Sequence, residues 1–159
     1  MIRTLIITLA LVTTNLNAEC LSPDPRFKTL DNDTVLDKTT GLTWMRCPYG
    51  MRWENNNCFG QSIRKDWRKA TLAPNHHNKT AKANPWRLPT LKELESLVAK
   101  SCYKPSIDEA TFPHTVPTGF WSITEDPESK RHAMIVFFLH GETYLSNKDD
   151  EWFVRLVKN

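Results

Sequence analysis

Six lysine and arginine side chains are concentrated in the middle of the chain, where they could bind an anion. Within residues 61–82 they are accompanied by a single acidic residue, Asp66. Arginine can bind a sulfate or carboxylate group through two parallel hydrogen bonds, and lysine adds a compact positive charge. The sequence therefore predicts a surface that binds an acidic polymer, formed by Arg64, Lys65, Arg68, Lys69, Lys79 and Lys82.

The spacing of the first four cations supports this hypothesis. If they lie on a helix, side chains four positions apart share one side of it. Arg64 would then lie beside Arg68. Lys65 would lie beside Lys69 on that side, while Trp67 would face the core. The plain alternative is a solvated helix face that keeps the protein soluble.

The other chemically interesting residues do not indicate an active site. His76 and His77 are adjacent, so their side chains point in different directions, and no third metal ligand stands at a helical or hairpin spacing. None of the remaining histidines has an obvious serine or cysteine nucleophile as a partner. We therefore expect a protein that is not an enzyme and has no cofactor or metal site. The run at residues 149–151 is expected to be a solvated acidic turn, with calcium binding as the alternative.

The N-terminus has the pattern of a signal peptide over residues 1–18. Arg3 gives a short positive start, residues 5–12 form an apolar core, and residues 16–18 fit a cleavage site. The apolar run is too short to span a bilayer, and no later segment is apolar enough to do so. We expect a periplasmic or secreted protein in which residues 19–159 form one domain.

The four cysteines of this exported chain are expected to form two disulfides, although four cysteines allow three connectivities. Cys47 and Cys58 bracket a loop that contains glycine and asparagine, which favours a local bond. The remaining pair is Cys20 with Cys102, whose bond would hold the N-terminal region beside the end of a helix. A metal site would need closer spacing of the cysteines.

The clearest structural signal is a helix that begins at Thr90. Thr90 and Glu93 have the spacing of a capping box, in which each side chain bonds the other residue's backbone amide. Leucines and a valine follow at helical spacing up to about Lys100. Pro89 ends the extended segment before the helix, and Arg87 is expected to pair with a carboxylate or with carbonyls of a neighbouring strand.

The remaining segments complete an α+β pattern of two helices and a small, mainly antiparallel sheet. Residues 34–46 read as a hairpin, and residues 62–73 read as the other helix. Residues 104–118 contain three prolines, which exclude a regular helix or a central strand. The C-terminal third reads as strands, with residues 152–157 closing the sheet.

Several motifs occur in a fixed order along the chain. Thr40 to Trp44 is followed by Trp86-Arg87-Leu88-Pro89-Thr90 with Glu93, then by Phe120-Trp121-Ser122 and Phe153-Val154-Arg155. Together they resemble the bacterial domain family of unknown function 1566, which includes the C-terminal domain of the Legionella collagen-like adhesin. The resemblance covers roughly residues 27 to 157. It implies a single C-type-lectin-like domain in which the two chain ends meet in one sheet.

The resemblance also implies a non-enzymatic binding domain for adhesion or surface recognition. Combined with the cluster of cations, it suggests an acidic, sulfated glycan as the ligand. A periplasmic protein-interaction module, such as an accessory or immunity partner, is the alternative. Nucleic acid is a poor candidate, because the chain is exported and its formal charge is only +3. The calcium-binding triplets of sugar-binding C-type lectins do not occur in the sequence, so calcium-dependent sugar binding is not expected.

Overall fold

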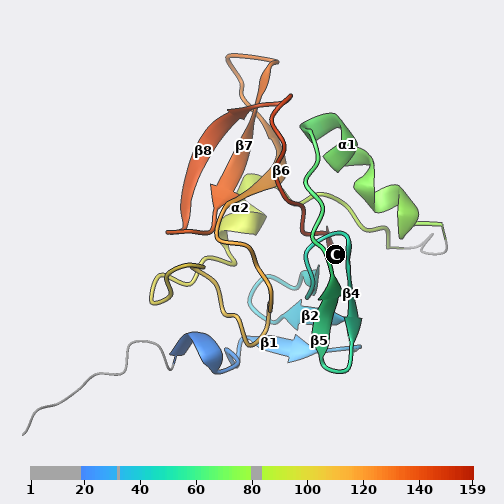
Figure 1. The fold of residues 1–159 in the computed structure, drawn as a ribbon, viewed down its shortest axis with the longest axis vertical. Coiled ribbons are helices and arrows are strands. Elements are labelled where there is room, and N and C mark those ends of the chain that lie inside the picture. Colours follow the sequence, from blue (N-terminus) through green and yellow to red (C-terminus); the bar gives the residue numbers. More distant parts are fainter. Residues whose placement is uncertain (1–18, 32, 80–83) are drawn as a thin grey trace, which may run out of the picture.

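Short strands and turns dominate the structure, a computed structural model that describes residues 19–31, 33–79 and 84–159. Two short helices and three small antiparallel sheets make up the regular part of these residues (Figure 1), which is the α+β class that the sequence predicts. The predicted signal peptide lies outside the described residues. The elements are β1 Phe27–Thr29, β2 Thr34–Asp37, β3 Thr43–Met45, β4 Met51–Glu54, β5 Asn57–Gly60, α1 Trp67–Leu72, α2 Leu91–Glu95, β6 Gly119–Glu125, β7 His132–Phe137, β8 Glu142–Asn147 and β9 Val157–Lys158, with 3-10 turns at Glu19–Leu21 and Ala73–His76.

The first and last strands of the described chain lie in one sheet, with the order β1-β2-β3-β9. Strands β2 and β3 form the hairpin predicted for residues 34–46. The buried Asp37 carboxylate holds this region, because it accepts hydrogen bonds from the Arg26 guanidinium at 2.6 and 2.8 Å and from the Thr40 hydroxyl at 2.7 Å. Burial acts to raise the pKa of Asp37, but these hydrogen bonds outweigh it and leave the pKa below its usual value.

A second sheet has the order β6-β7-β8 and lies at the top of Figure 1. The prediction that residues 152–157 close this C-terminal sheet is wrong. Phe153 makes one parallel bridge to Phe120 in β6, and the chain then continues to β9, which pairs with β3 in the other sheet.

The physical reason is that this C-terminal segment is buried on both sides. Val154 packs in the hydrophobic cluster that contains Trp121. Phe153 packs in the other cluster, which contains Trp44. Successive side chains of an extended chain point to opposite faces, so the segment contributes to both clusters at once. Its alternating pattern therefore reflects two cores rather than one core and solvent.

Helix α1 begins later than the predicted range of residues 62–73. Asp66 is its N-cap and accepts a hydrogen bond from the Lys69 amide at 2.8 Å. The residues before Asp66 are extended, because Lys65 and Trp152 exchange backbone hydrogen bonds of 2.9 and 3.1 Å. This pairing with a distant part of the chain removes the first predicted turn of the helix.

The predicted helix start at Thr90 is confirmed, although α2 is shorter than expected. The Thr90 hydroxyl accepts from the Glu93 amide at 3.3 Å, and the Glu93 carboxylate accepts from the Thr90 amide at 2.7 Å. The helix does not continue to Lys100, because the Ala99 amide donates to the Ser106 carbonyl at 3.1 Å instead of to a helical carbonyl.

The structure contains both predicted disulfides. Cys20 is bonded to Cys102 across a sequence separation of 82, and Cys47 is bonded to Cys58 across a separation of 11. The segment that the shorter bond closes is not an irregular loop, since β4 and β5 form a hairpin within it. Its tip is Asn55-Asn56, with φ angles of +49° and +60°. Asparagine tolerates this left-handed region, which suits a tight hairpin turn.

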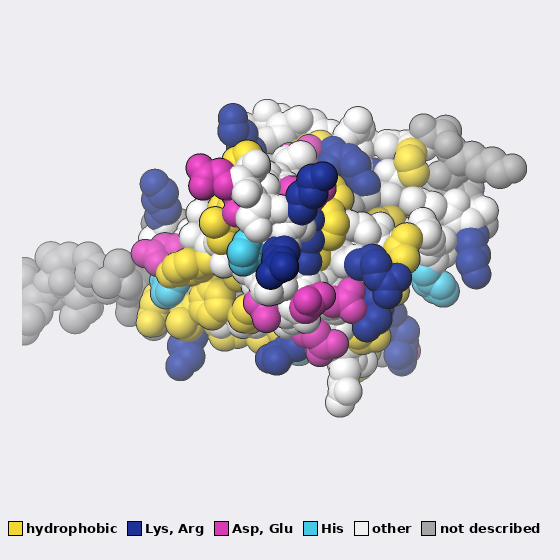
Figure 2. Space-filling model, turned by 90° about the horizontal axis from the view of Figure 1, so that it is seen from above, with side chains coloured by type: hydrophobic (Ala, Val, Ile, Leu, Met, Phe, Trp, Pro, Cys, Tyr) yellow, Lys and Arg dark blue, Asp and Glu magenta, His cyan; other side chains and the backbone are white. Residues whose placement is uncertain are grey.

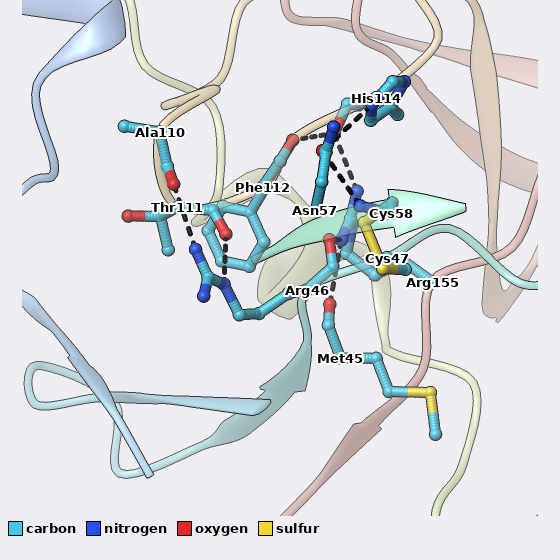
Figure 3. The surroundings of a disulfide bond; sticks show 11 residues. Met45, Arg46, Cys47, Asn57, Cys58, Ala110, Thr111, Phe112, His114 and Arg155 are labelled. Atoms are coloured by element: carbon cyan, nitrogen blue, oxygen red, sulfur yellow. Dashed lines mark hydrogen bonds between the residues drawn. A yellow bond between two sulfur atoms is a disulfide. The ribbon is translucent and has the colours of Figure 1, made fainter. Parts of the chain in front are cut away.

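A fully buried arginine lies close to the Cys47–Cys58 disulfide (Figure 3). The Arg155 guanidinium donates to the Met45 carbonyl at 2.8 Å, to the Arg46 carbonyl, and to the Thr115 hydroxyl at 2.7 Å. It also lies 5.0 Å from the centre of the Phe112 ring. Burial lowers the pKa of Arg155 to about 9, so the side chain is charged at neutral pH. Arg155 therefore joins the C-terminal segment to β3 and to residues 104–118, which contain Thr115.

Candidate binding surfaces

The predicted basic surface centres on the basic segment, residues 64–69, but its side chains do not lie along one helix. Arg64 and Lys65 precede α1, whereas Arg68 and Lys69 belong to it. The Arg64 guanidinium lies 5.2 Å from the centre of the Phe153 ring, and the Lys65 ammonium lies 5.1 Å from the centre of the Tyr49 ring. The i to i+4 alignment expected from a continuous helix is therefore wrong.

The cations of this segment differ in how far their charge is neutralised. The Lys69 ammonium lies 2.7 Å from the Asp66 carboxylate, which raises the pKa of Lys69 and lowers that of Asp66. Arg64 and Arg68 are exposed, and within the described residues neither has a carboxylate at ion-pair distance. Lys79 is exposed after the second 3-10 turn, and Lys82 lies outside the described residues. The guanidinium groups are thus the better candidates for binding an anion.

The acidic turn, residues 149–151, lies next to the basic segment. The Trp67 amide donates to the Lys148 carbonyl at 2.9 Å, and the backbone pairing at Lys65 adjoins the end of the turn. The charge of Glu151 contributes to the raised pKa of Lys69. Acidic and basic side chains are accordingly neighbours on the face shown in Figure 2. An acidic ligand on the basic segment would approach these carboxylates as well.

A second surface, which the sequence analysis missed, is formed by rings where the Ile135 face of β7 and β8 meets Trp152. We call it the aromatic groove. Hydrophobic side chains gather next to histidines on one part of the face shown in Figure 2. The groove has a volume of about 580 Å³. Its lining comprises His132, Ile135, Phe137, His140, Tyr144, Leu145, Ser146, Asn147, Asp150 and Trp152.

Strand pairing explains why these rings meet. Phe137 ends β7, and its pairing partner Glu142 begins β8, so Tyr144 falls two residues along the neighbouring strand on the same face. Trp152 reaches the groove from the segment after the acidic turn. The aromatic residues are visible in the sequence, but the strand register that brings them together is not.

The Trp86–Glu93 motif forms a scaffold beside α2. Arg87 and Glu93 are joined by an ion pair, and the Pro89 carbonyl accepts a hydrogen bond from the Ile123 amide at 2.7 Å. The Trp86 backbone is held from both sides, because its amide donates to the Asn78 side chain and its carbonyl accepts from it, each at 2.7 Å. These contacts link α2 to β6 and to the turn after α1.

No metal-binding arrangement is found in the described ranges. Histidine, cysteine and acidic side chains there do not form any group of three or more that could hold a metal ion. His76 and His77 contact each other edge to face at 5.4 Å, and His77 also contacts Tyr49 at 6.2 Å. Burial, with a contribution from His76, lowers the pKa of His77.

Comparison with known proteins places the chain in a family. No match was found among curated proteins. The model of the Lcl C-terminal domain family matches residues 33–158, which include every strand except β1, both helices and the Cys47–Cys58 disulfide. Because this match spans most of the chain, the protein belongs to the Lcl C-terminal domain family.

Proposed function

We propose that this protein is an exported, adhesin-like domain that is not an enzyme and that binds an acidic, sulfated glycan. Membership of the Lcl C-terminal domain family suggests the non-enzymatic, adhesin-like character. The ligand class is our own inference. It rests on one observation: Arg64 and Arg68 are exposed, close in sequence, and lack a carboxylate at ion-pair distance among the described residues.

The disulfides support export. The structure contains two disulfides, and such bonds persist in oxidising compartments outside the cytosol. Among the described residues, no helix has the length and apolar character needed to cross a bilayer. The N-terminal pattern of residues 1–18 adds to this proposal, which places the protein in the periplasm or outside the cell. The meeting of both chain ends in one sheet supports the C-type-lectin-like architecture that we also propose.

The proposed contact is electrostatic and distributed over several side chains. Exposed charges attract weakly through water, so one cation cannot hold a glycan alone. Arg64 and Arg68 would provide the main contacts, with Lys65 and Lys69 beside them. Lys79 and Lys82 would contribute less. Binding should therefore weaken steeply with added salt, because ions screen charges over about 10 Å at 0.1 M.

Heparin affinity chromatography at low and high salt tests this proposal. Wild-type protein should be retained at low salt and released at higher salt, and Arg64→Ala with Arg68→Ala should reduce retention. The matched control is Lys28→Ala with Lys38→Ala, which removes two exposed cations from the β1–β2 region. If wild-type protein is not retained at low salt, the acidic-glycan proposal is wrong and the protein-interaction module becomes the leading hypothesis.

A further inference from the structure

We propose that the aromatic groove is a second binding site, which takes the apolar face of a neutral pyranose ring. The proposal is independent of the basic segment, because the groove uses other residues and a different kind of contact. A pyranose presents C–H groups on its faces and hydroxyl groups around its rim. A matching site needs aromatic surface together with a few polar groups, and the groove contains both.

Phe137 is the centre of the aromatic part. Its ring centroid lies 5.9 Å from that of Tyr144 and 6.1 Å from that of Trp152. Both rings stand steeply to Phe137, at interplanar angles of 89° and 79°. The His140 ring is tilted by only 30° to Phe137 at 5.5 Å. The rings therefore cluster around Phe137 in different orientations, and together they supply aromatic surface for contact with a flat, disc-like ligand.

The polar part is arranged around Asp150. Its Oδ2 atom accepts hydrogen bonds from the Ser146 hydroxyl at 2.7 Å and from the Asn147 amide at 3.1 Å. The Trp152 indole donates to the same Ser146 oxygen at 2.7 Å, which fixes the tryptophan relative to the carboxylate. Within the described residues, the Oδ1 atom of Asp150 accepts no hydrogen bond. It is therefore free to accept one from a ligand hydroxyl.

The size of the groove favours a saccharide over a protein partner. Its volume of about 580 Å³ lies in the usual range for small-ligand sites. A stable protein interface uses roughly 20–30 residues on each side, two to three times the number that line this groove. Tyr144 also contributes exposed aromatic surface to the groove, since this residue is 42% exposed. A ring ligand that covers Phe137 and Tyr144 would remove part of this surface from water.

Nuclear magnetic resonance of ¹⁵N-labelled protein tests the proposal directly. The probes are three neutral oligosaccharides: cellohexaose, maltohexaose and chitohexaose. We expect at least one of them to shift the indole N–H signal of Trp152 in a saturable manner, equally at low and high salt. If none of the three shifts that signal, the proposal is overturned.

Variants of Tyr144 decide whether the shift arises in the groove. Tyr144→Ala should weaken the affinity about fivefold by removing one ring, whereas Tyr144→Phe should keep most of it. The control is Tyr103→Ala, another exposed tyrosine that lies outside the groove. Equal affinity of wild-type and Tyr144→Ala would overturn the proposal, as would a dimer in sedimentation that Tyr144→Ala dissociates. The pair Arg64→Ala with Arg68→Ala should leave this binding unchanged, so a failure here is distinct from a failure of heparin binding.

Discussion

Arg87 and Glu93 form a two-pronged ion pair, with Nη1 to Oε2 at 2.7 Å and Nη2 to Oε1 at 2.8 Å. The Oε2 atom also accepts the Thr90 amide of the capping box at 2.7 Å. A single carboxylate therefore fixes both the start of α2 and the segment that leads into it. Because they share this carboxylate, Arg87 and Thr90 should be coupled in their effect on the free energy of unfolding.

The stability of the domain should depend on the ionisation of Glu93. The hydrogen bonds from Arg87 lower the pKa of Glu93 below its usual value of 4.5, and they outweigh the opposing effect of burial. A lowered folded-state pKa means that this stabilisation is present above pH 4.5 and is lost as the pH falls through the folded-state value. Glu93→Gln should therefore flatten the acid branch of the unfolding free energy measured with urea. The exposed Glu128→Gln serves as the control and should leave the wild-type slope unchanged.

Thr90→Ala and Arg87→Ala should have non-additive effects on stability. Loss of the Thr90 cap should cost about 1 kcal/mol. Arg87 is partly exposed, so its removal should cost a similar amount, about 1 kcal/mol, rather than the larger cost of a fully buried ion pair. Because both residues act on Glu93, the double variant should lose a different amount from the sum. Urea unfolding of the four proteins measures this coupling, and strict additivity would contradict it.

Arg155 should be needed for stability even though it has no carboxylate partner within the described residues. Arg155→Met keeps much of the volume but removes the donors to the Met45 and Arg46 carbonyls, which should cost roughly 2 kcal/mol. Arg155→Ala adds a cavity and should cost roughly 3–5 kcal/mol. Urea unfolding with the disulfides intact gives both values. A methionine variant as stable as the wild type would show that the two carbonyls find other donors.

The two disulfides should contribute unequally. In the chain-entropy model, the bond across 82 residues should be worth about 4.5 kcal/mol and the bond across 11 residues about 3 kcal/mol. Cys20→Ser with Cys102→Ser should therefore lower the melting temperature more than Cys47→Ser with Cys58→Ser. The reverse order in calorimetry would mean that the packing around the hairpin, including Arg155, dominates over chain entropy.

Neutralising part of the acidic turn should strengthen heparin binding. Glu151 lies close enough to affect Lys69, so Glu151→Gln should shift release from heparin to higher salt. Asp150 is unsuitable for this test, because its carboxylate holds Ser146 and the Asn147 amide. Glu128→Gln, which removes a carboxylate on the β6–β7 turn, is the charge-matched control. Equal gains from both variants would mean that only net charge matters.

The features predicted correctly from the sequence depend mainly on nearby residues. The Thr90 capping box needs a spacing of three, and the hairpin of residues 34–46 needs only its own strands and turn. The Asp66 cap was also visible in the sequence as a helix-start signal. The cations before Asp66 fit a helical spacing equally well, so the sequence alone does not determine which residue begins the helix.

The features that the sequence predicts wrongly, or does not predict at all, depend on contacts between residues that are distant in the sequence. The pairing of Lys65 with Trp152 makes the first half of the basic segment extended, and nothing near Lys65 in sequence indicates it. The C-terminal segment continues to β9 instead of closing the β6-β7-β8 sheet because its side chains pack in both hydrophobic clusters. These clusters exist only in the folded chain. The aromatic groove depends on the register between β7 and β8, which periodicity alone does not determine.

The pairing of β9 with β3 determines the order in which a newly made chain can complete its parts. A ribosome releases the N-terminal end first, so the residues of the β4–β5 hairpin are available before those of β6 to β9. The sheet that starts with β1 lacks its last strand until residues 157–158 emerge. The apolar residues that pack with Trp44, among them Phe120 and Val136, also come later in the chain, so this part of the core stays open until they have been made.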